Sequence, residues 1–201
     1  QKNVILSQWA AIDNHRVLGG MADEEYLYEV SFVGGFNRYR EWFIKKLAHL
    51  GIKVECFGRG WNNSFIDLDR MQRVFQLSKI NLNLSNSLCH DIRFLLSNPF
   101  NLLDYMKYQK DIGQIKARNF EIPYYGGFQV TDFFPGIEDY FKIGEEIACF
   151  KDVEEAAFLI KYYLENDELR KEMALKASMN ARANHGYANR FRDILGAVKI
   201  K

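Results

Sequence analysis

The sequence predicts an α/β protein with a Rossmann-like parallel sheet and helices on both faces. Three observations support this fold class. Hydrophobic periodicity alternates along the chain between strand-like and helix-like segments. The first strand, helix and strand fit within about thirty residues, which is the length of a βαβ unit. The unit then recurs, and by its handedness and length it implies a parallel sheet that is covered on both faces.

The first βαβ unit begins with a strand at residues 28–35 that ends in two glycines. Residues 39–50 carry apolar side chains at helical spacing, and Gly51 supplies a C-terminal stop for this helix. Residues 52–57 form the next expected strand. The later expected helices are 67–78, 115–124, one that begins after Asp152, 167–183 and 189–198, and the later expected strands are 80–84, 127–131 and 147–150.

Two segments fall outside this alternation. Residues 1–27 are expected to be a linker or interdomain arm with a short strand at 4–6, and residues 28–201 form the Rossmann-like domain. Residues 85–113 are too long and apolar for a plain loop and predict a helical insert. The insert is either a pair of short helices packed on the sheet, or a lid, an acceptor-side element or a membrane-surface contact. Only Lys107 and Lys110 offer the basic face that a membrane contact needs.

Composition limits the classes of function. The 201 residues carry a net charge of +1, so neither nucleic acid nor an anionic membrane is expected as the principal partner. Three widely spaced cysteines, Cys56, Cys89 and Cys149, predict free thiols in a reducing, cytoplasmic setting. No apolar run approaches the roughly 20 residues of a transmembrane helix. The chain starts with Gln rather than Met, which suggests a piece of a longer polypeptide.

Residues 114–121, together with the glycine-containing segment 126–132, place cations and a lone carboxylate just before a buried strand. Lys116 and Arg118 have the charge that a diphosphate needs, and Glu121 is an acceptor of the kind that ribose hydroxyls need. This is the chemistry of a nucleotide-sugar site. The alternative is a solvated helix face on which Glu121 pairs with Arg118 or Lys116.

The pattern of Lys116, Arg118, Phe120, Glu121, Gly126, Gly127, Thr131 and Asp132 resembles the C-terminal half of GT-B glycosyltransferases of the group 1 family, most closely the CgeB-like group. The resemblance extends over about residues 28–190 and is most specific over 117–152. It implies the donor-binding half of an enzyme that transfers a sugar from a nucleotide diphosphate sugar. Glu121 would accept hydrogen bonds from the ribose, and Lys116 and Arg118 would bind the diphosphate and offset charge on the leaving nucleotide.

The resemblance also implies that no metal and no further cofactor is required. The acceptor, whether glycan, lipid or protein, is not identified, and the N-terminal domain that supplies the base in inverting members is expected to be missing. Retaining members often carry a second Glu eight residues before the Glu121 position, where this chain has Gly113. No catalytic residue, sugar contact or stereochemical outcome is therefore assigned.

Gly34 and Gly35 leave room for a ligand where the first strand ends, at the edge where open α/β sheets bind ligands. A tight turn explains two glycines equally well. Arg38 and Arg40 lie in the first helical turns, where cations are disfavoured unless an anion binds. Alternatively, Arg40 faces Glu41 or solvent. If these residues form the donor site, they share one sheet edge with residues 58–61 and the start of helix 115–124.

The remaining motifs give weaker indications of function. Residues 58–61 could place the backbone or Trp61 near the base, or Trp61 could be packed. The four histidines lack metal-ligand spacing, adjacent His90 and Asp91 are poorly placed for a dyad, and His185 is expected in a turn. A noncatalytic nucleotide- or partner-binding module stays open as the alternative function. A dinucleotide oxidoreductase would need the full glycine fingerprint and an acid near the end of the second strand, where the chain offers only Glu55.

Overall fold

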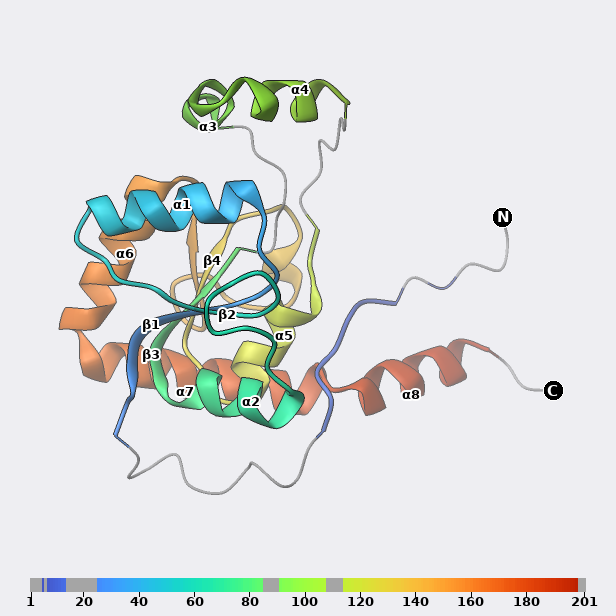
Figure 1. The fold of residues 1–201 in the computed structure, drawn as a ribbon. Coiled ribbons are helices and arrows are strands. Elements are labelled where there is room, and N and C mark those ends of the chain that lie inside the picture. The colour runs from blue at the N-terminus through green and yellow to red at the C-terminus, as the bar shows by residue number, and fades with distance from the viewer. Residues whose placement is uncertain (1–4, 6, 14–24, 85–90, 108–113, 199–201) are drawn as a thin grey trace.

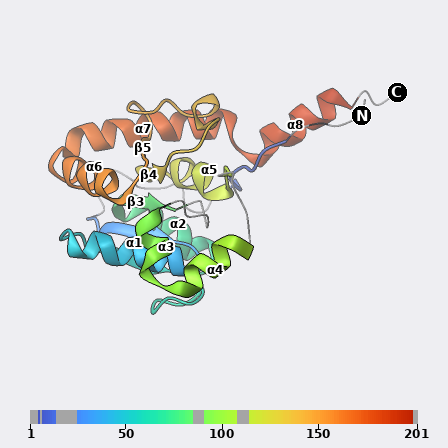
Figure 2. The same ribbon diagram turned by 90° about the horizontal axis from the view of Figure 1, so that it is seen from above.

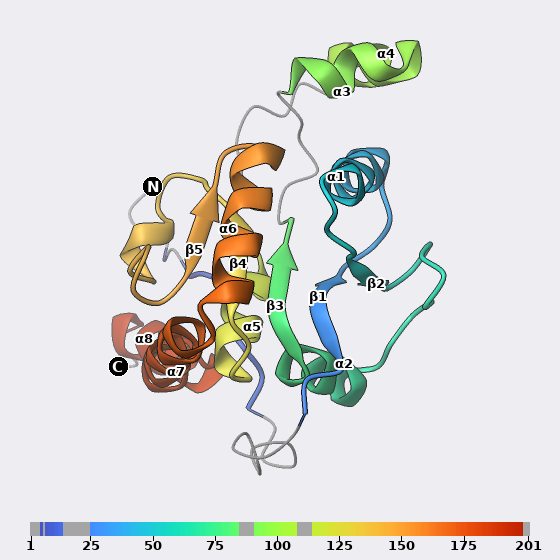
Figure 3. The ribbon, with the colours of Figure 1, turned by 90° about the vertical axis from the view of Figure 1, so that its left-hand side faces the viewer.

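A computed structural model describes residues 5, 7–13, 25–84, 91–107 and 114–198. The strands form a parallel sheet with the order β2-β1-β3-β4-β5, as Figure 3 shows. This arrangement confirms the expected Rossmann-like fold. The strands are β1 (Tyr28–Val33), β2 (Glu55–Phe57), β3 (Ser78–Asn83), β4 (Gln129–Asp132) and β5 (Ala148–Phe150).

Helices cover both faces of the sheet, each over its own apolar core (Figures 1 and 2). One face carries α1 (Arg38–His49) and α6 (Val153–Glu165), and the other carries α2 (Leu68–Gln76) and α5 (Ala117–Tyr124). The chain continues through a short 3-10 turn (Ile137–Asp139), α7 (Asp167–Asn184) and α8 (Tyr187–Ala197). None of the described helices combines the length and apolar character needed to cross a membrane.

The boundary between α2 and β3 differs from the expectation. Assigning Ser78 to the end of a helix was wrong, because Ser78 pairs with Tyr28 and begins β3. The Ser78 hydroxyl donates to the carbonyl of Val74 at 2.5 Å. The side chain of Ser78 therefore satisfies a carbonyl in the last turn of α2, while the backbone of Ser78 already belongs to the strand. A local sequence pattern does not distinguish these two roles of one serine.

The insert contains two short helices, α3 (Ile92–Ser97) and α4 (Pro99–Lys107), but they lie beside α1 rather than on the sheet (Figure 1). Phe94 packs against Tyr39 and Trp42 of α1, with ring centroids 5.5 and 5.8 Å apart. Arg93 forms an ion pair with Glu154 at the start of α6. Residues 85–90 and 108–113, with Cys89, His90, Lys110 and Gly113, lie outside the described residues.

Part of the N-terminal arm packs on the body of the domain. Ala10 and Ala11 are fully buried, and Ala11 bridges the junction of α7 and α8. The Ala11 amide donates to the carbonyl of His185 at 3.0 Å, and the Tyr187 amide donates to the carbonyl of Ala11 at 3.1 Å. The strand expected at residues 4–6 cannot be compared, because residues 4 and 6 lie outside the described part of the chain.

His185 holds this junction in its neutral form, so we expect stability to depend on pH. Nε2 donates to the carbonyl of Tyr140 at 3.1 Å, and Nδ1 accepts from Arg190 at 3.2 Å. Burial lowers the pKa of His185; the bond to Tyr140 opposes that shift, Arg190 adds to it and Glu146 opposes it. The unfolded state therefore binds the proton more readily than the folded state does, and stability should fall as the pH drops below about 6.5.

Urea unfolding at a series of pH values between about 5 and 8 tests this expectation. His185→Gln should flatten the dependence, whereas exposed His49→Gln on α1 should leave it unchanged. Equal pH dependence in the chain and in His185→Gln would contradict the assignment.

Candidate functional site

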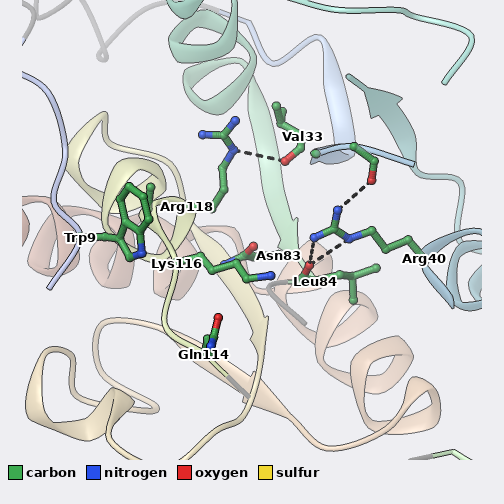
Figure 4. Close-up of a pocket in the computed structure, with 11 residues that line it drawn as sticks. Trp9, Val33, Arg40, Asn83, Leu84, Gln114, Lys116 and Arg118 are labelled. Carbon is green, nitrogen blue, oxygen red and sulfur yellow. Dashed lines mark hydrogen bonds between the residues drawn. The ribbon is translucent and has the colours of Figure 1, made fainter. Parts of the chain in front are cut away.

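A pocket of about 350 Å³ lies at the carboxyl edge of the sheet, where β1 and β3 end (Figure 4). Because all strand pairs are parallel, every strand delivers its C-terminal loop to this edge. The residues that line the pocket come from the arm, the ends of β1 and β3, α1 and the start of α5. They are Trp9, Val33, Gly34, Gly35, Arg40, Asn83, Leu84, Gln114, Lys116, Ala117 and Arg118.

Gly34 and Gly35 form the wall of the pocket that follows β1. The Gly34 amide donates to Phe57 at the end of β2, and its carbonyl accepts from the indole of Trp61 at 2.9 Å. Trp61 also packs against Phe36, so the structure shows the packed alternative for this ring. The loops after β1 and β2 and the start of α5 therefore share one edge of the sheet, as expected.

Arg40 joins the ends of two strands across the pocket. Nη1 donates to the carbonyl of Gly35 at 2.7 Å, and Nε and Nη2 donate to the carbonyl of Leu84 at 3.2 and 2.7 Å. Burial lowers the pKa of the guanidinium, Asp132 raises it and Arg118 lowers it. Arg40 therefore faces neither Glu41 nor open solvent. A guanidinium has five N–H donors, and its bonds to described residues use three of them.

The start of α5 is fixed to the sheet by Asn119. Its side-chain oxygen accepts from the Lys116 amide at 3.0 Å, and its nitrogen donates to the Thr131 hydroxyl at 3.3 Å. Lys116 is the N-cap residue of a helix with no acidic residue in its first turn. A cation at this end of the helix is destabilised by the helix dipole. An anion bound there would be stabilised by the dipole and by the cation.

Arg118 and Glu121 form an ion pair within α5. Arg118 also donates from Nε to the carbonyl of Val33 at 3.3 Å, which brings its guanidinium to the pocket. The ion pair is the pairing that the alternative expected, but Glu121 is only 8% exposed and therefore does not lie on a solvated helix face. Its Oε2 is bonded to Arg118, and no bond joins Oε1 to a described residue. Glu121 is not among the residues that line the pocket, but its bond to Arg118 places it next to one that does.

The predicted site residues thus separate into two groups. Five of them line the pocket, and these are Gly34, Gly35, Arg40, Lys116 and Arg118. Glu121 is joined to the pocket through Arg118. Arg38 is exposed, lies over the ring of Phe100 at 5.9 Å and does not line the pocket.

Sequence reasoning missed four polar or aromatic residues at this edge: Trp9, Asn83, Gln114 and Asn119. One signal was present for Asn83. Amide side chains at positions 81 and 83 alternate along a strand that is otherwise apolar, and a strand covered on both faces normally has few polar residues. The sequence held no comparable signal for Trp9, because its position depends on how the arm folds back.

In the described part of the chain, no three His, Cys, Asp or Glu side chains are grouped closely enough to hold a metal ion. Burial raises the pKa of the Cys56 and Cys149 thiols to about 12. Both thiols therefore stay protonated near neutral pH and are poor nucleophiles.

Solved structures of GT-B glycosyltransferases share this fold. TarM matches with a TM-score of 0.61 and 13% identity over 92% of this chain and 38% of its own. An alpha1,3-fucosyltransferase matches with a TM-score of 0.56 and 15% identity over 89% of this chain and 45% of its own. AviGT4, a glycosyltransferase involved in avilamycin A biosynthesis, matches with a TM-score of 0.54 and 12% identity over 94% of this chain and 57% of its own. The chain therefore spans about two fifths to three fifths of the length of these proteins.

The family follows from the sequence itself. None of the curated proteins matches the chain. The sequence profile of a family described as glycosyl transferase-like matches residues 38–196, which include α1, the α5 motif and nearly all of α8. That match extends over most of the 201 residues. The chain therefore belongs to the glycosyl transferase-like family.

Proposed function

We propose that this chain is the donor-binding half of a GT-B glycosyltransferase and that its pocket binds the diphosphate of a nucleotide-sugar donor. The observation that carries the proposal is the convergence of Arg40, Lys116 and Arg118 beside Gly34 and Gly35 at the carboxyl edge of the sheet. Besides burial, the positive charge of Arg118 lowers the pKa of Arg40, and a bound diphosphate would offset this repulsion between the two guanidinium groups.

The roles of the residues follow from their geometry. Lys116 at the start of α5 and the Arg40 donors that no described residue uses meet the phosphate oxygens. The ribose lies at the edge of the pocket next to Arg118, where Oε1 of Glu121 accepts from a ribose hydroxyl while Oε2 stays bonded to Arg118. The positive groups then offset the charge that develops on the leaving diphosphate. Membership of the glycosyl transferase-like family supports this assignment.

Turnover needs a second domain under this proposal. The chain covers less than two thirds of the length of each of the three structures, and the resemblance to GT-B enzymes implies a site that closes between two domains. The catalytic base and the acceptor site are therefore assigned to a partner domain. The chain by itself is expected to bind donor without transferring sugar.

We expect the chain to bind a nucleoside diphosphate weakly and without added metal, because arginine and lysine supply the positive charge. Calorimetric titration with UDP, GDP and ADP, with and without EDTA, tests this. Lys116→Ala should weaken the binding of whichever nucleotide the chain binds. Lys161→Ala, which removes an exposed lysine of α6, should leave that binding unchanged. An absolute requirement for a divalent cation, or binding that survives Lys116→Ala unchanged, would count against the proposal.

A further inference from the structure

Asn83 is a buried amide at the wall of the pocket. It ends β3, is 3% exposed and lines the pocket, yet its Nδ2 has no hydrogen-bond partner among the described residues. A buried polar group left without a partner costs about 1–3 kcal/mol. Such a group is tolerated where something outside the folded chain completes its bonding.

Asn81 shows that the fold can satisfy an amide on this face of the sheet. It lies two residues earlier on β3, so its side chain points to the same side. Asn81 accepts from Ser31 at 3.1 Å and donates to Phe75 and Phe128 at 3.0 and 3.3 Å. Asn83 lies beyond these partners, where the sheet ends and the pocket begins.

Trp9 contributes an exposed aromatic surface to the pocket that Asn83 lines. Its side chain is 55% exposed although it belongs to an arm whose next two residues are fully buried. The backbone bonds of Ala11 to His185 and Tyr187 fix the arm, so the indole is held at the pocket rather than on a loose tail. Figure 4 draws Trp9 beside Lys116 on one side of the pocket and Arg40 on the other.

An aromatic face and a neutral amide together fit a sugar ring. The negative face of an indole attracts the C–H bonds on one face of a pyranose. An amide donates and accepts, as each sugar hydroxyl does, and it rotates to present either atom. Phosphate oxygens, by contrast, are served better by the neighbouring cations Lys116 and Arg40.

We propose that Trp9 and Asn83 form the subsite for the sugar that is transferred. Trp9 stacks on the ring and Asn83 bonds to a hydroxyl, while the cations hold the diphosphate. The inference rests on the proposed donor site and adds the residues that distinguish a nucleotide sugar from the bare nucleotide. The sugar-contacting role that Gly113 cannot provide thereby passes to residues outside the α5 motif.

Calorimetry with three matched pairs of ligands tests the subsite: UDP and UDP-glucose, GDP and GDP-mannose, ADP and ADP-glucose. The variants are Asn83→Leu and Trp9→Ala. In the pair of ligands that the chain binds, each variant should lower the affinity for the nucleotide sugar by about three- to tenfold, the range for one hydrogen bond or one aromatic contact. Each should leave the bare nucleotide within about twofold, because the diphosphate contacts are unchanged.

Two variants serve as matched controls. Gln129→Leu removes another buried amide, on β4, that has no partner in the described part of the chain and does not line the pocket. Phe65→Ala removes an exposed aromatic side chain outside the pocket. Neither should change the preference for the sugar. Thermal unfolding should show Asn83→Leu at least as stable as the parent chain, because an unsatisfied amide has been removed. If Asn83→Leu does not fold, the outcome for Trp9→Ala decides.

The outcomes separate the two claims. A parent chain that binds none of the six ligands overturns the donor site and the subsite together. Nucleotide binding with an unchanged sugar preference in both variants overturns the subsite alone. Equal weakening of nucleotide and nucleotide sugar also overturns it, because Trp9 and Asn83 would then contact the nucleotide.

Discussion

Glu121→Ala is expected to weaken the binding of a ribonucleoside diphosphate by about 1.5–3 kcal/mol, the range for a hydrogen bond to a charged group. Oε1 of Glu121 is the atom assigned to the ribose hydroxyls, and Arg118 holds this carboxylate in place through Oε2. Calorimetry measures the loss. The analogue without ribose hydroxyls should lose less, because it makes no bond to Glu121 in the parent chain.

Arg118→Ala should weaken both ligands alike, and the remaining affinity should depend less on salt, because a charge near the phosphates is gone. The two residues are partners, so the double variant should lose less than the sum of the single losses. Glu172→Ala breaks an exposed ion pair with Lys176 and is the matched control. Unchanged binding of both ligands in a folded Glu121→Ala variant would refute the ribose assignment.

Gly58→Ala is expected to destabilise the fold by about 2–5 kcal/mol, from backbone strain and overpacking together. Gly58 has φ of +126°, and a Cβ added there would lie 2.4 Å from the carbonyl oxygen of Gly34. The neighbouring atom is backbone, so no side-chain rotation relieves the contact. Relief requires Gly34 to move, and the pocket wall moves with it.

Urea unfolding measures the loss of stability, and the affinity for a nucleoside diphosphate reports the displaced wall. Gly51→Ala is the control, since Gly51 has φ of +84° but no neighbour within 4 Å of an added Cβ. Gly51→Ala should therefore show the backbone strain alone. A Gly58→Ala variant no less stable than Gly51→Ala would show that the loops after β1 and β2 are not in tight contact.

The sheet and most of its helices could be predicted because their pattern is local. A strand covered on both faces is mostly apolar, and a helix over a sheet repeats its apolar residues every three or four positions. Boundaries were less certain wherever one side chain serves two elements, as Ser78 does. The insert could be recognised as helical, but its position beside α1 depends on Phe94 and Arg93, whose partners are distant in sequence.

The pocket was predictable only in part. The types of charge at positions 40, 116 and 118 were visible in the sequence, and the fold brings these residues together. Their partners were not visible. Arg40 bonds to a carbonyl 44 residues away, and Arg118 to one 85 residues away, so only the folded chain shows how much of each guanidinium is already used. Asn83 shows the converse: only the folded chain reveals that its nitrogen lacks a partner among the residues that the structure describes.

The buried pair Ala10 and Ala11 decides where this domain can be cut. A fragment that starts at β1 would keep every strand, yet it would expose the junction of α7 and α8 and leave the His185 carbonyl and the Tyr187 amide without their Ala11 bonds. It would also lose the indole at the pocket. For expression, domain grafting or the construction of a two-domain chimera, the unit to move must therefore begin before Trp9.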